Sequence, residues 1–457
     1  MTKPIVGIDL GTTNSCVAVL EGDEPTVLPN EEGSRTTPSV VGFPEDGEGD
    51  PFVGEQAKRQ AIVSPRHTIY DIKRVVGLKA DSDVVEKRRK RYPFEITEAT
   101  NGDAWIQVDD QKFSPEELSG MILSKMRSTA EDYFGQEVTE AVITVPAYFD
   151  DAQRSATKNA GKIAGLDVRR IVNEPTAAAL AYGYSKGDDA DIAVFDLGGG
   201  TFDISIMKLR QGVFDVAATA GDNDLGGEDF DNAILEFLLE EFEEETGIDV
   251  SDDKMALQRL HEAAEEAKCE LSSLSETNIN LPFLAVDDDG PQHLSLTLTR
   301  SELNDLVYHL VEQLEEPTES ALEDADIDPG DLDDVLLVGG MTRMPLVQKK
   351  VEEIFDQEPS KELNPDEVVA MGAAVQSGVL QGEVREVVLL EVTPMALGIR
   401  TEGDSFSEII PKNTSIPTQD TKVFTTTEDD QSVVTINVLQ GNSDKASENK
   451  HLGTFNL

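Results

Sequence analysis

The chain has 457 residues, of which 39% are hydrophobic, and this length and composition predict two or three domains with packed cores. Its 90 acidic residues outnumber its 38 basic ones, so the formal net charge is −52, which argues against nucleic acid and anionic membranes as partners because both need basic patches. No run of about 18 apolar residues occurs, and the N-terminus lacks the apolar region of a signal peptide. Since Cys16 and Cys269 form no closely spaced pair, we expect a reducing compartment, the cytoplasm.

The acidic residues are spread along the whole chain, which differs from a disordered acidic tail. An entirely acidic surface repels itself in dilute buffer. Concentrated salt relieves that repulsion, because the Debye length shrinks to about 3 Å at 1 M. We therefore hypothesise a host with a very salty cytoplasm, and a halophilic archaeon in particular.

The first predicted element is a strand pair over residues 5–20, whose turn reads Asp9-Leu-Gly-Thr-Thr-Asn14. A second strand pair, over 193–207, has the related turn Asp196-Leu-Gly-Gly-Gly-Thr201. Three consecutive glycines weaken a strand pair, so their presence indicates a backbone that approaches a ligand and directs N–H groups at phosphate. The carboxylates of Asp9 and Asp196 would repel phosphates unless a cation lay between them, so they predict a Mg²⁺ ion held through its water ligands. An ordinary glycine-rich hairpin is the alternative.

Several elements between these turns leave their chemistry open. We predict a helix over Thr68–Val76, which contains Lys73, and a helix from Ser114 to about Phe134 that begins with a capping serine and a proline. The run Lys87–Arg91 is the only basic block in the sequence. A basic block could indicate nucleic acid, but amid so much acid we expect local ion pairs.

Two predicted strands of the first half end at residues of interest. The strand over Ala141–Val145 ends at Pro146, and the strand over Val168–Val172 is followed by Glu174. Ligands gather at the carboxyl ends of strands in α/β sheets, so Glu174 could hydrogen-bond an attacking water or a hydrated Mg²⁺. It could equally be an acid favoured by the dipole of the next helix.

The second half contains a further helix and a third turn. Met255–Leu271 is amphipathic, and Glu265, Lys268 and Ser272 share one of its stripes, although an exposed Glu–Lys pair is the simpler interpretation. Asp334–Val338 is predicted as a buried strand, followed by Gly339-Gly340 and a helix that begins at Pro345. Such a helix start favours anions.

The end of the chain changes character. An Ala-rich helix is predicted within Asn364–Gln376, and the segment Gly382–Glu391 then holds four consecutive apolar residues where a linker is normally polar. We expect this apolar linker to dock on the protein. From Val392 onward, alternation of period two predicts β structure.

Four motifs, in this order, carry a family resemblance: Gly7-Ile-Asp-Leu-Gly-Thr-Thr-Asn-Ser-Cys16, Asn173-Glu-Pro-Thr-Ala-Ala-Ala179, Phe195-Asp-Leu-Gly-Gly-Gly-Thr-Phe-Asp203 and Val338-Gly-Gly-Met-Thr-Arg-Met-Pro345. The chain resembles the seventy-kilodalton heat-shock chaperones of the DnaK type from Pro4 to Leu457. The resemblance implies an α/β fold, an actin-like two-lobed ATPase with duplicated ribonuclease-H-like halves, followed by the start of an antiparallel β-sandwich.

The resemblance also implies a domain organisation. It predicts a nucleotide-binding domain over 1–382 (lobe I about 1–186, lobe II about 187–382), an apolar interdomain linker over 383–391 and a partial peptide-binding β domain over 392–457. Because the family's β domain is longer, we expect a chain truncated within the substrate-binding β domain.

The implied function is that of an ATP-dependent chaperone, in which hydrolysis of ATP to ADP and phosphate controls binding and release of unfolded or extended polypeptides. ATP/ADP and Mg²⁺ are the implied cofactors, with K⁺. The implied partners include a J-domain co-chaperone and a GrpE-type nucleotide exchange factor.

The resemblance assigns site residues by motif. Catalysis falls to Lys73, Glu174, Thr201 and Asp203, and water-mediated Mg²⁺ to Asp9 and Asp196. Nucleotide binding falls to Gly11, Thr12, Thr13, Asn14, Gly198, Gly199, Gly200, Thr201, Gly227, Glu265, Lys268, Ser272, Gly339, Gly340, Arg343 and Asp366. Interdomain relay falls to Pro146, Arg154, Val388, Leu389, Leu390 and Glu391. Peptide binding falls to Ile399, Thr401, Phe424, Thr425, Val434 and Ile436.

The sequence departs from the family pattern at four positions. Cys269 stands where arginine is frequent, which questions stacking on the base, and Glu391 stands where aspartate is usual. Glu402 and Thr427 occupy arch positions that are often apolar, so a more polar clamp over substrate is expected.

Two other functional classes share some of these features. A small-molecule kinase could use the same cleft, and phosphorylation of glycerol or a sugar would reveal it. A filament-forming, actin-like structural protein is the second alternative, and ATP-dependent light scattering would show filaments.

Overall fold

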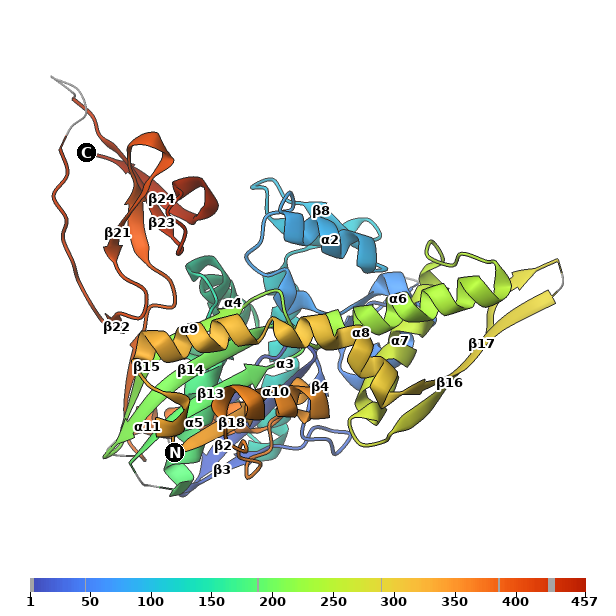
Figure 1. Cartoon of the computed structure of the whole chain (residues 1–457), viewed down its shortest axis with the longest axis horizontal. Coiled ribbons are helices and arrows are strands. Elements are labelled where there is room, and N and C mark those ends of the chain that lie inside the picture. Colours follow the sequence, from blue (N-terminus) through green and yellow to red (C-terminus); the bar gives the residue numbers. More distant parts are fainter. Residues whose placement is uncertain (1–3, 46, 187–188, 289, 385–386, 426–431) are drawn as a thin grey trace.

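The computed structural model describes residues 4–45, 47–186, 189–288, 290–384, 387–425 and 432–457, so the arch residue Thr427 lies outside the described residues. The chain forms a mixed α/β structure with two large sheets and several small ones (Figure 1). None of the described helices is both long and apolar enough to cross a lipid bilayer.

The first large sheet has the strand order β12-β11-β1-β2-β3, with the short strand β4 paired to β2. Strand β11 is parallel to β1 and β12, whereas β2 is antiparallel to both of its neighbours, β1 and β3. The bounds are β1 Ile5–Asp9, β2 Asn14–Glu21, β3 Glu24–Val27, β4 Thr37–Pro38, β11 Glu140–Val145 and β12 Asp167–Asn173.

The second large sheet has the order β18-β13-β14-β15-β19-β22. Strand β18 is parallel to β13, and β13, β14 and β15 are antiparallel, so these four repeat the order and directions of β11, β1, β2 and β3. The bounds are β13 Ala190–Leu197, β14 Phe202–Arg210, β15 Val213–Asp222, β18 Asp334–Val338, β19 Val388–Val392 and β22 Ser415–Ile416. Each sheet therefore presents an Asp-Leu-Gly turn at the corresponding place.

Two helices rich in small residues connect the sheets. Helices α5 (Glu174–Lys186) and α11 (Val368–Gln381) pack on each other, and α11 also contacts β1 and β2. The contact is so close that a Cβ added at Gly372 would lie 1.7 Å from the Ala177 carbonyl oxygen. The alanines of α5 serve this tight packing, because larger side chains would separate the helices.

Helices and small sheets complete both sides. On the first sheet, α3 (Pro115–Phe134) packs on α4 (Asp151–Ile163), and beside them lie α1 (Glu55–Gln60), α2 (Asp83–Arg91), the sheet β10-β9-β8 and the sheet β6-β5-β7. Their strands are β5 Val41–Gly42, β6 Phe52–Val53, β7 Thr68–Ile69, β8 Glu95–Glu98, β9 Ala104–Val108 and β10 Gln111–Phe113.

On the second side, α6 (Gly227–Thr246) packs on α7 (Lys254–Leu271), and α9 (Glu315–Ala325) covers β14 and β15. The hairpin β16 (Glu276–Asp287) and β17 (Gly290–Thr299) projects from α7, and α8 (Arg300–Glu312) and α10 (Pro345–Phe355) follow (Figure 1). A four-stranded antiparallel sheet, β21-β20-β23-β24, ends the chain, with bounds β20 Leu397–Arg400, β21 Phe406–Ile410, β23 Thr435–Gln440 and β24 Lys450–Asn456.

Two helix predictions had opposite outcomes. The helix from Ser114 to Phe134 is confirmed, and Ser114 and Glu117 form a reciprocal capping box at its start. The helix over Thr68–Val76 is wrong. Residues 68–69 form strand β7, and Lys73 lies in a short 3₁₀ helix, Ile72–Arg74, entered through Asp71 with a φ of 53°. That left-handed residue ends the strand and prevents a continuous α-helix.

The linker docks as a strand. Three linker residues, Val388, Leu389 and Leu390, pair with Val213, Phe214 and Asp215 at the edge of the second sheet, so the apolar segment extends that sheet.

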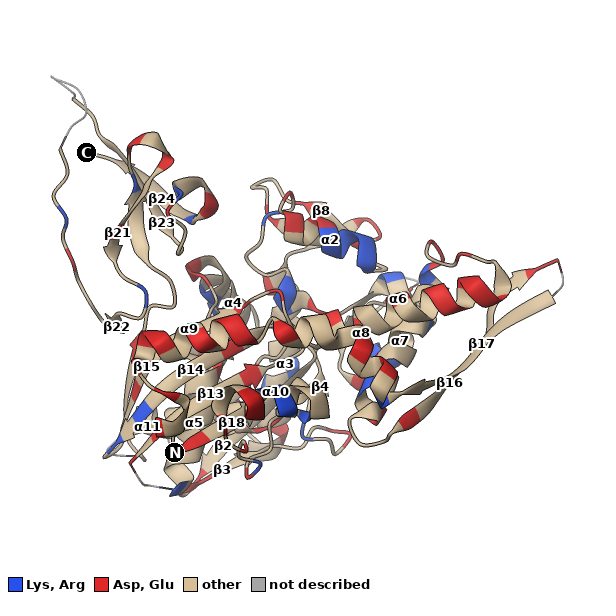
Figure 2. Ribbon diagram, in the orientation of Figure 1, with Lys and Arg blue, Asp and Glu red and all other residues tan. Residues whose placement is uncertain are grey.

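The two kinds of charged residue are distributed differently over the molecule. Asp and Glu are spread over most of the helices, whereas Lys and Arg gather on α2 (Figure 2).

Candidate functional site

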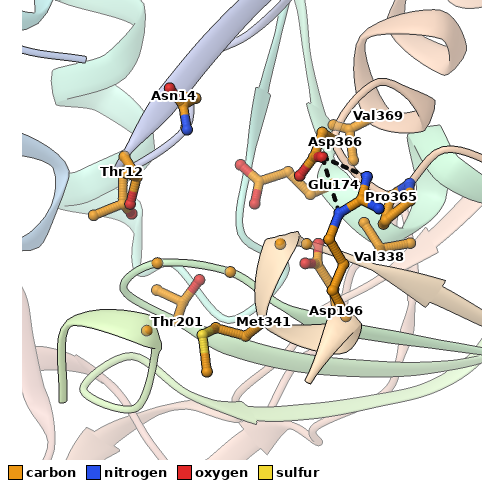
Figure 3. A pocket seen from close by; sticks show the side chains of 18 of the residues that line it. Thr12, Asn14, Glu174, Asp196, Thr201, Val338, Met341, Pro365, Asp366 and Val369 are labelled. Carbon is orange, nitrogen blue, oxygen red and sulfur yellow. Dashed lines mark hydrogen bonds and ion pairs between the residues drawn. The ribbon is translucent and has the colours of Figure 1, made fainter. Parts of the chain in front are cut away.

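A cavity of about 330 Å³ lies between the turns of the two large sheets. Figure 3 shows Thr12 and Asn14 on one side of it and Thr201 and Met341 on another. Nearly all residues assigned to nucleotide, metal or catalysis line this cavity: Asp9, Gly11, Thr12, Thr13, Asn14, Lys73, Glu174, Asp196, Gly198, Gly199, Thr201, Gly227, Glu265, Lys268, Ser272, Gly339, Gly340, Arg343 and Asp366. Gly200 and Asp203 are not among the lining residues, although the nearby Gly199 and Thr201 are.

The glycines of the second turn allow the two turns to touch. A Cβ added at Gly199 would lie 2.1 Å from Thr13 Oγ1, and one at Gly200 would lie 2.8 Å from Thr12 Oγ1. Gly226, at the start of α6, approaches the same backbone, because its Cβ would lie 2.5 Å from the Gly200 nitrogen. Three elements therefore meet where no side chain fits, which accounts for Gly199 and Gly200, whereas a Cβ at Gly198 would meet only the Thr201 carbonyl oxygen at 3.8 Å.

A cluster of charged residues, which we call the floor of the cavity, consists of Asp9, Lys73, Glu174, Asp196 and Asp203. It contains a buried ion pair. Lys73 Nζ donates to Glu174 Oε1 at 2.6 Å, and both side chains are 9% exposed. Asp9 accepts a hydrogen bond from Thr144 Oγ1 at 3.1 Å, and Asp203 Oδ1 accepts one from the Tyr148 backbone N–H at 2.9 Å. Asp203 Oδ2 is buried and has no hydrogen-bond partner within the described ranges of the chain.

The floor carries more negative charge than Lys73 offsets. Burial, together with the charge of Glu174, raises the pKa of Asp9 to about 7 and that of Asp203 to about 7. The same two causes raise the pKa of Asp196 well above its usual range. Burial alone would lower the pKa of Lys73, but Glu174 and Asp9 outweigh it, so that pKa is raised. A cation that arrives with a ligand would relieve this crowding.

These carboxylates fit the implied Mg²⁺ when it is held through water. Within the described residues, no group of three or more His, Cys, Asp or Glu side chains is arranged to hold a metal ion directly. Asp9 is instead the last residue of β1, Asp196 is the last but one of β13, and both line the same cavity. Mg²⁺ commonly keeps several waters and binds one or two carboxylates plus phosphate oxygens, which matches this donor set.

The opposite end of the cavity is lined by α7. Glu265 accepts from Lys58 Nζ at 2.9 Å, and Lys268 Nζ donates to Asp231 Oδ2 at 2.6 Å. The simpler interpretation of α7, an exposed pair between Glu265 and Lys268, is therefore wrong, because each residue pairs elsewhere and Lys268 is buried. Cys269 also lines the cavity and is a free thiol.

The third turn closes the cavity from the side. Gly339 has a φ of 82°, and a Cβ there would lie 2.3 Å from the Leu197 carbonyl oxygen, so it touches the second turn. Arg343 binds Asp366 at 2.7 Å, the ion pair dashed in Figure 3. Apolar residues that sequence reasoning did not assign also line this side: Val338, Met341, Met344, Pro365 and Val369. Only the spacing of Met341 and Met344 around Arg343 could have signalled them.

The residues assigned to relay form a connected path. Arg154 donates to Asn173 Oδ1 at 2.8 Å and to the Ala147 and Pro146 carbonyls at 2.7 and 3.5 Å. Asn173 precedes Glu174, and its backbone N–H donates to Glu391 Oε1 at 3.4 Å. The linker is thus in hydrogen-bond contact with the residue next to the floor of the cavity.

The six residues assigned to peptide binding are only partly brought together. Ile399 lies on β20, Ile436 lies on the neighbouring strand β23, and Thr401 and Val434 lie just beyond the ends of those strands. Phe424 and Thr425 lie in an exposed segment outside all strands. Their placement on a shared groove stays a prediction.

Two sheets with a repeated strand order, and a cavity between their turns, are typical of an α/β protein that binds its ligand in a cleft. The chain matches the family described as Hsp70 protein over residues 5–457. It therefore belongs to the Hsp70 family, and its architecture is consistent with the family's actin-like ATPase fold. Members of this family are ATPases that bind ATP or ADP and act as chaperones, and membership implies polypeptide substrates and co-chaperones.

Proposed function

We propose that the chain hydrolyses ATP in the cavity between the two sheets and uses the nucleotide state to control polypeptide binding by its C-terminal sheet. The observation that carries the proposal is the Lys73–Glu174 pair among Asp9, Asp196 and Asp203, below two touching glycine turns. Backbone N–H groups of such turns suit phosphate oxygens, and a closed floor positions water for an in-line attack.

The residues of the floor have distinct proposed roles. Lys73, held by Glu174, orients the attacking water beside the terminal phosphate, and Asp203 Oδ2 accepts a hydrogen bond from that water. Asp9 and Asp196 would hold Mg²⁺ through its waters, and the bound ion would neutralise charge on the phosphates. Positioning and charge stabilisation account for most of the catalysis in phosphoryl transfer, so this site needs no strong base.

Contacts to the C-terminal sheet support the proposed coupling. Tyr148 donates its backbone N–H to Asp203 on the floor, while its hydroxyl accepts from Asn442 Nδ2 at 3.1 Å in the loop after β23. Lys412 binds Asp324 of α9 at 2.6 Å, and Lys450 binds Asp150 at 3.3 Å. A change on the floor can therefore alter contacts that hold the C-terminal sheet and the linker.

The finer features of the proposal follow the family motifs. We propose two lobes, lobe I over about 1–186 and lobe II over about 187–382, as duplicated halves, because β11-β1-β2-β3 and β18-β13-β14-β15 share order and direction. A DnaK-type cycle, with a J-domain co-chaperone and a GrpE-type exchange factor, is part of the same proposal, as is the use of K⁺.

The test measures ATP turnover by the whole chain in molar KCl with Mg²⁺, with and without an unfolded apolar peptide. We expect slow turnover that the peptide accelerates, and Asp9→Asn and Asp196→Asn variants that bind Mg·ADP about 10- to 100-fold more weakly. Parent-like turnover and Mg·ADP affinity in both variants would contradict the assigned roles.

The charge of −52 supports a second proposal, that the fold is adapted to concentrated salt. Self-repulsion of the acidic surface weakens as salt screens it, so the melting temperature should rise with KCl and the protein should unfold in dilute buffer. A melting temperature that does not change with KCl would reject this adaptation.

A further inference from the structure

The basic block of α2 takes part in an ion-pair cluster that the proposed chemistry does not use. We call this cluster the α2 clamp and define it as Arg74, Arg88, Arg91, Asp224 and Asp229. Arg88 binds Asp224 and also donates to the backbone carbonyl of Arg74. Arg74 binds Asp229 at 2.9 Å and Asp224 at 3.2 Å, and Arg91 lies 3.6 Å from Asp229.

Every ion pair of the clamp crosses between the proposed lobes. The three arginines belong to lobe I, from the 3₁₀ helix before α2 and from α2 itself. The two aspartates belong to lobe II, in the turn after β15 and in the first turn of α6. Arg89 of the same helix makes a useful contrast, since its partners Glu86, Ala80 and Ile96 all lie in lobe I.

Three of the five clamp side chains are buried, whereas those of Asp224 and Arg91 are 39% and 40% exposed. The side chains of Arg74 and Arg88 are 3% and 6% exposed, and that of Asp229 is 15% exposed. Salt screens exposed charges strongly but screens buried pairs much less. Removal of one partner from a buried pair also leaves a charge that water cannot reach. The clamp should therefore keep its strength in a solvent that weakens surface ion pairs.

The clamp connects directly to the walls of the cavity. Asp229 Oδ2 accepts from the Gly226 backbone N–H at 3.0 Å, which fixes the start of α6. There the N–H groups of Gly227 and Glu228 donate to the Gly198 and Gly199 carbonyls at 3.0 and 2.9 Å.

On the lobe I side, Arg74 directly follows Lys73. A Cβ at Gly200 would lie 2.9 Å from Arg74 Cγ, so the arginine stem also touches the second turn. The clamp thus holds the second turn against the element that carries Lys73. Separation of the lobes must break it.

We propose that the α2 clamp sets the rate at which nucleotide leaves the cleft, with Arg88 as a positioning residue that acts through Arg74 and Asp224. This inference rests on the proposed function, because it assumes that ADP occupies the cavity. Without Arg88, Arg74 loses the contact at its carbonyl and Asp224 loses its nearest cation. The lobes then separate more often, and bound ADP escapes faster.

The experiment follows release of a fluorescent ADP from the full chain in molar KCl with Mg²⁺, by stopped-flow chase with excess ATP. We expect Arg88→Met to release the probe about tenfold faster than the parent, since it removes the ion pair with Asp224 between the lobes and leaves the buried Arg74 carbonyl without its donor. Arg89→Met is the matched control and should stay within about twofold of the parent, because its pairs lie inside one lobe. Single-turnover hydrolysis should change less than about threefold in Arg88→Met, because the Lys73–Glu174 pair is intact.

Two further variants separate positioning from general destabilisation. Arg88→Lys keeps the charge and should restore slow release in part. Asp224→Asn, whose side chain is 39% exposed in the parent and is therefore tolerant of change, should also release faster. The double variant of Arg88→Met and Asp224→Asn should release no faster than the faster single variant, because both remove one interaction.

Equal release by Arg88→Met and Arg89→Met, or additive effects in the double variant, would overturn the clamp. A parent that fails to bind the fluorescent ADP at all would instead reject the proposed function, so the two failures are distinguishable.

Discussion

The two ends of the cavity treat charge in opposite ways. On the floor, Asp9, Glu174, Asp196 and Asp203 surround Lys73, and negative charge is in excess. At the α7 end, three acids each pair with a cation of their own: Glu265 with Lys58, Asp231 with Lys268 and Glu228 with His261.

The pKa values of Asp9, Asp203 and Glu228 follow this difference, whereas burial outweighs Lys268 and raises the pKa of Asp231 at the α7 end to about 6. Burial and carboxylate crowding raise the pKa of Asp9 and Asp203 to about 7 on the floor. At the other end, burial would raise the pKa of Glu228, but His261 and Arg74 outweigh it and lower that pKa. An excess of buried charge has to be compensated by something that binds, whereas balanced pairs hold structure. The comparison therefore distinguishes the end where a bound ligand would have to bring positive charge from the end where three acids already have cation partners.

The largest effect is expected when the only lysine of the floor, Lys73, is replaced by a neutral residue. Lys73→Met should lower single-turnover ATP hydrolysis by roughly 100- to 1,000-fold, because a preorganised charge near the reacting phosphate is lost. Hydrolysis is measured by rapid quench in molar KCl. Lys158→Met, which changes an exposed residue of α4, is the control. Hydrolysis at the parental rate in Lys73→Met would show that the floor is not the reaction site.

The balanced end is tested through pH. Burial lowers the pKa of His261, but Glu228 and Asp231 outweigh it and raise that pKa from 6.5 to about 10. Because the folded pKa is the higher one, the stabilisation is complete below about pH 6.5 and is lost as pH rises towards about 10. Asp71 and the Tyr70 ring also face His261 from an adjacent element.

We therefore expect the melting temperature of the apoprotein to fall between about pH 7 and about pH 9.5, and His261→Gln to reduce that fall. The variant should also lose about 1–3 kcal/mol of unfolding free energy at neutral pH, since Glu228 keeps only a neutral donor. His309→Gln, on the exposed face of α8, is the control. An unchanged pH dependence in His261→Gln would show that another group titrates.

The smallest effect is expected at the exposed rim of the same end. Lys58 is 41% exposed, and its pair with Glu265 should contribute only about 0.2–1 kcal/mol to unfolding free energy, less in concentrated salt. Lys58→Met is compared with Lys268→Met, which removes the partner of the buried Asp231 and should destabilise more. A larger loss from Lys58→Met than from Lys268→Met would reverse the ranking of exposed and buried pairs drawn here.

Most of the site could be predicted from the sequence because short local motifs carry the residues that form it. Three glycine turns after buried strands were visible from composition and spacing, and all three line the cavity. The capped start of α3 was equally local. The helix predicted around Lys73 failed because Thr68 and Ile69 pair with Val41 and Gly42, residues distant in the chain, and a local pattern cannot anticipate that partner.

Pairing of charges was the least predictable feature. Glu265 and Lys268 look like partners on one helix, yet Lys58 and Asp231 reach them from other elements. The basic block of α2 was expected to form local ion pairs, which holds for Arg89 with Glu86. It is wrong for Arg88 and Arg91, whose partners Asp224 and Asp229 are far away in the chain, and nothing in the local sequence indicated those partners.

The sequence by itself determined where backbone could come close to a ligand, because only glycine permits such an approach, and it determined the acidic surface, because charge is a sum over residues. Which carboxylates share one lysine, which arginine crosses the cleft and where the apolar linker docks were decided only by tertiary structure. Those outcomes depend on distances between segments far apart in the chain, and both burial and electrostatic energy are set by such distances.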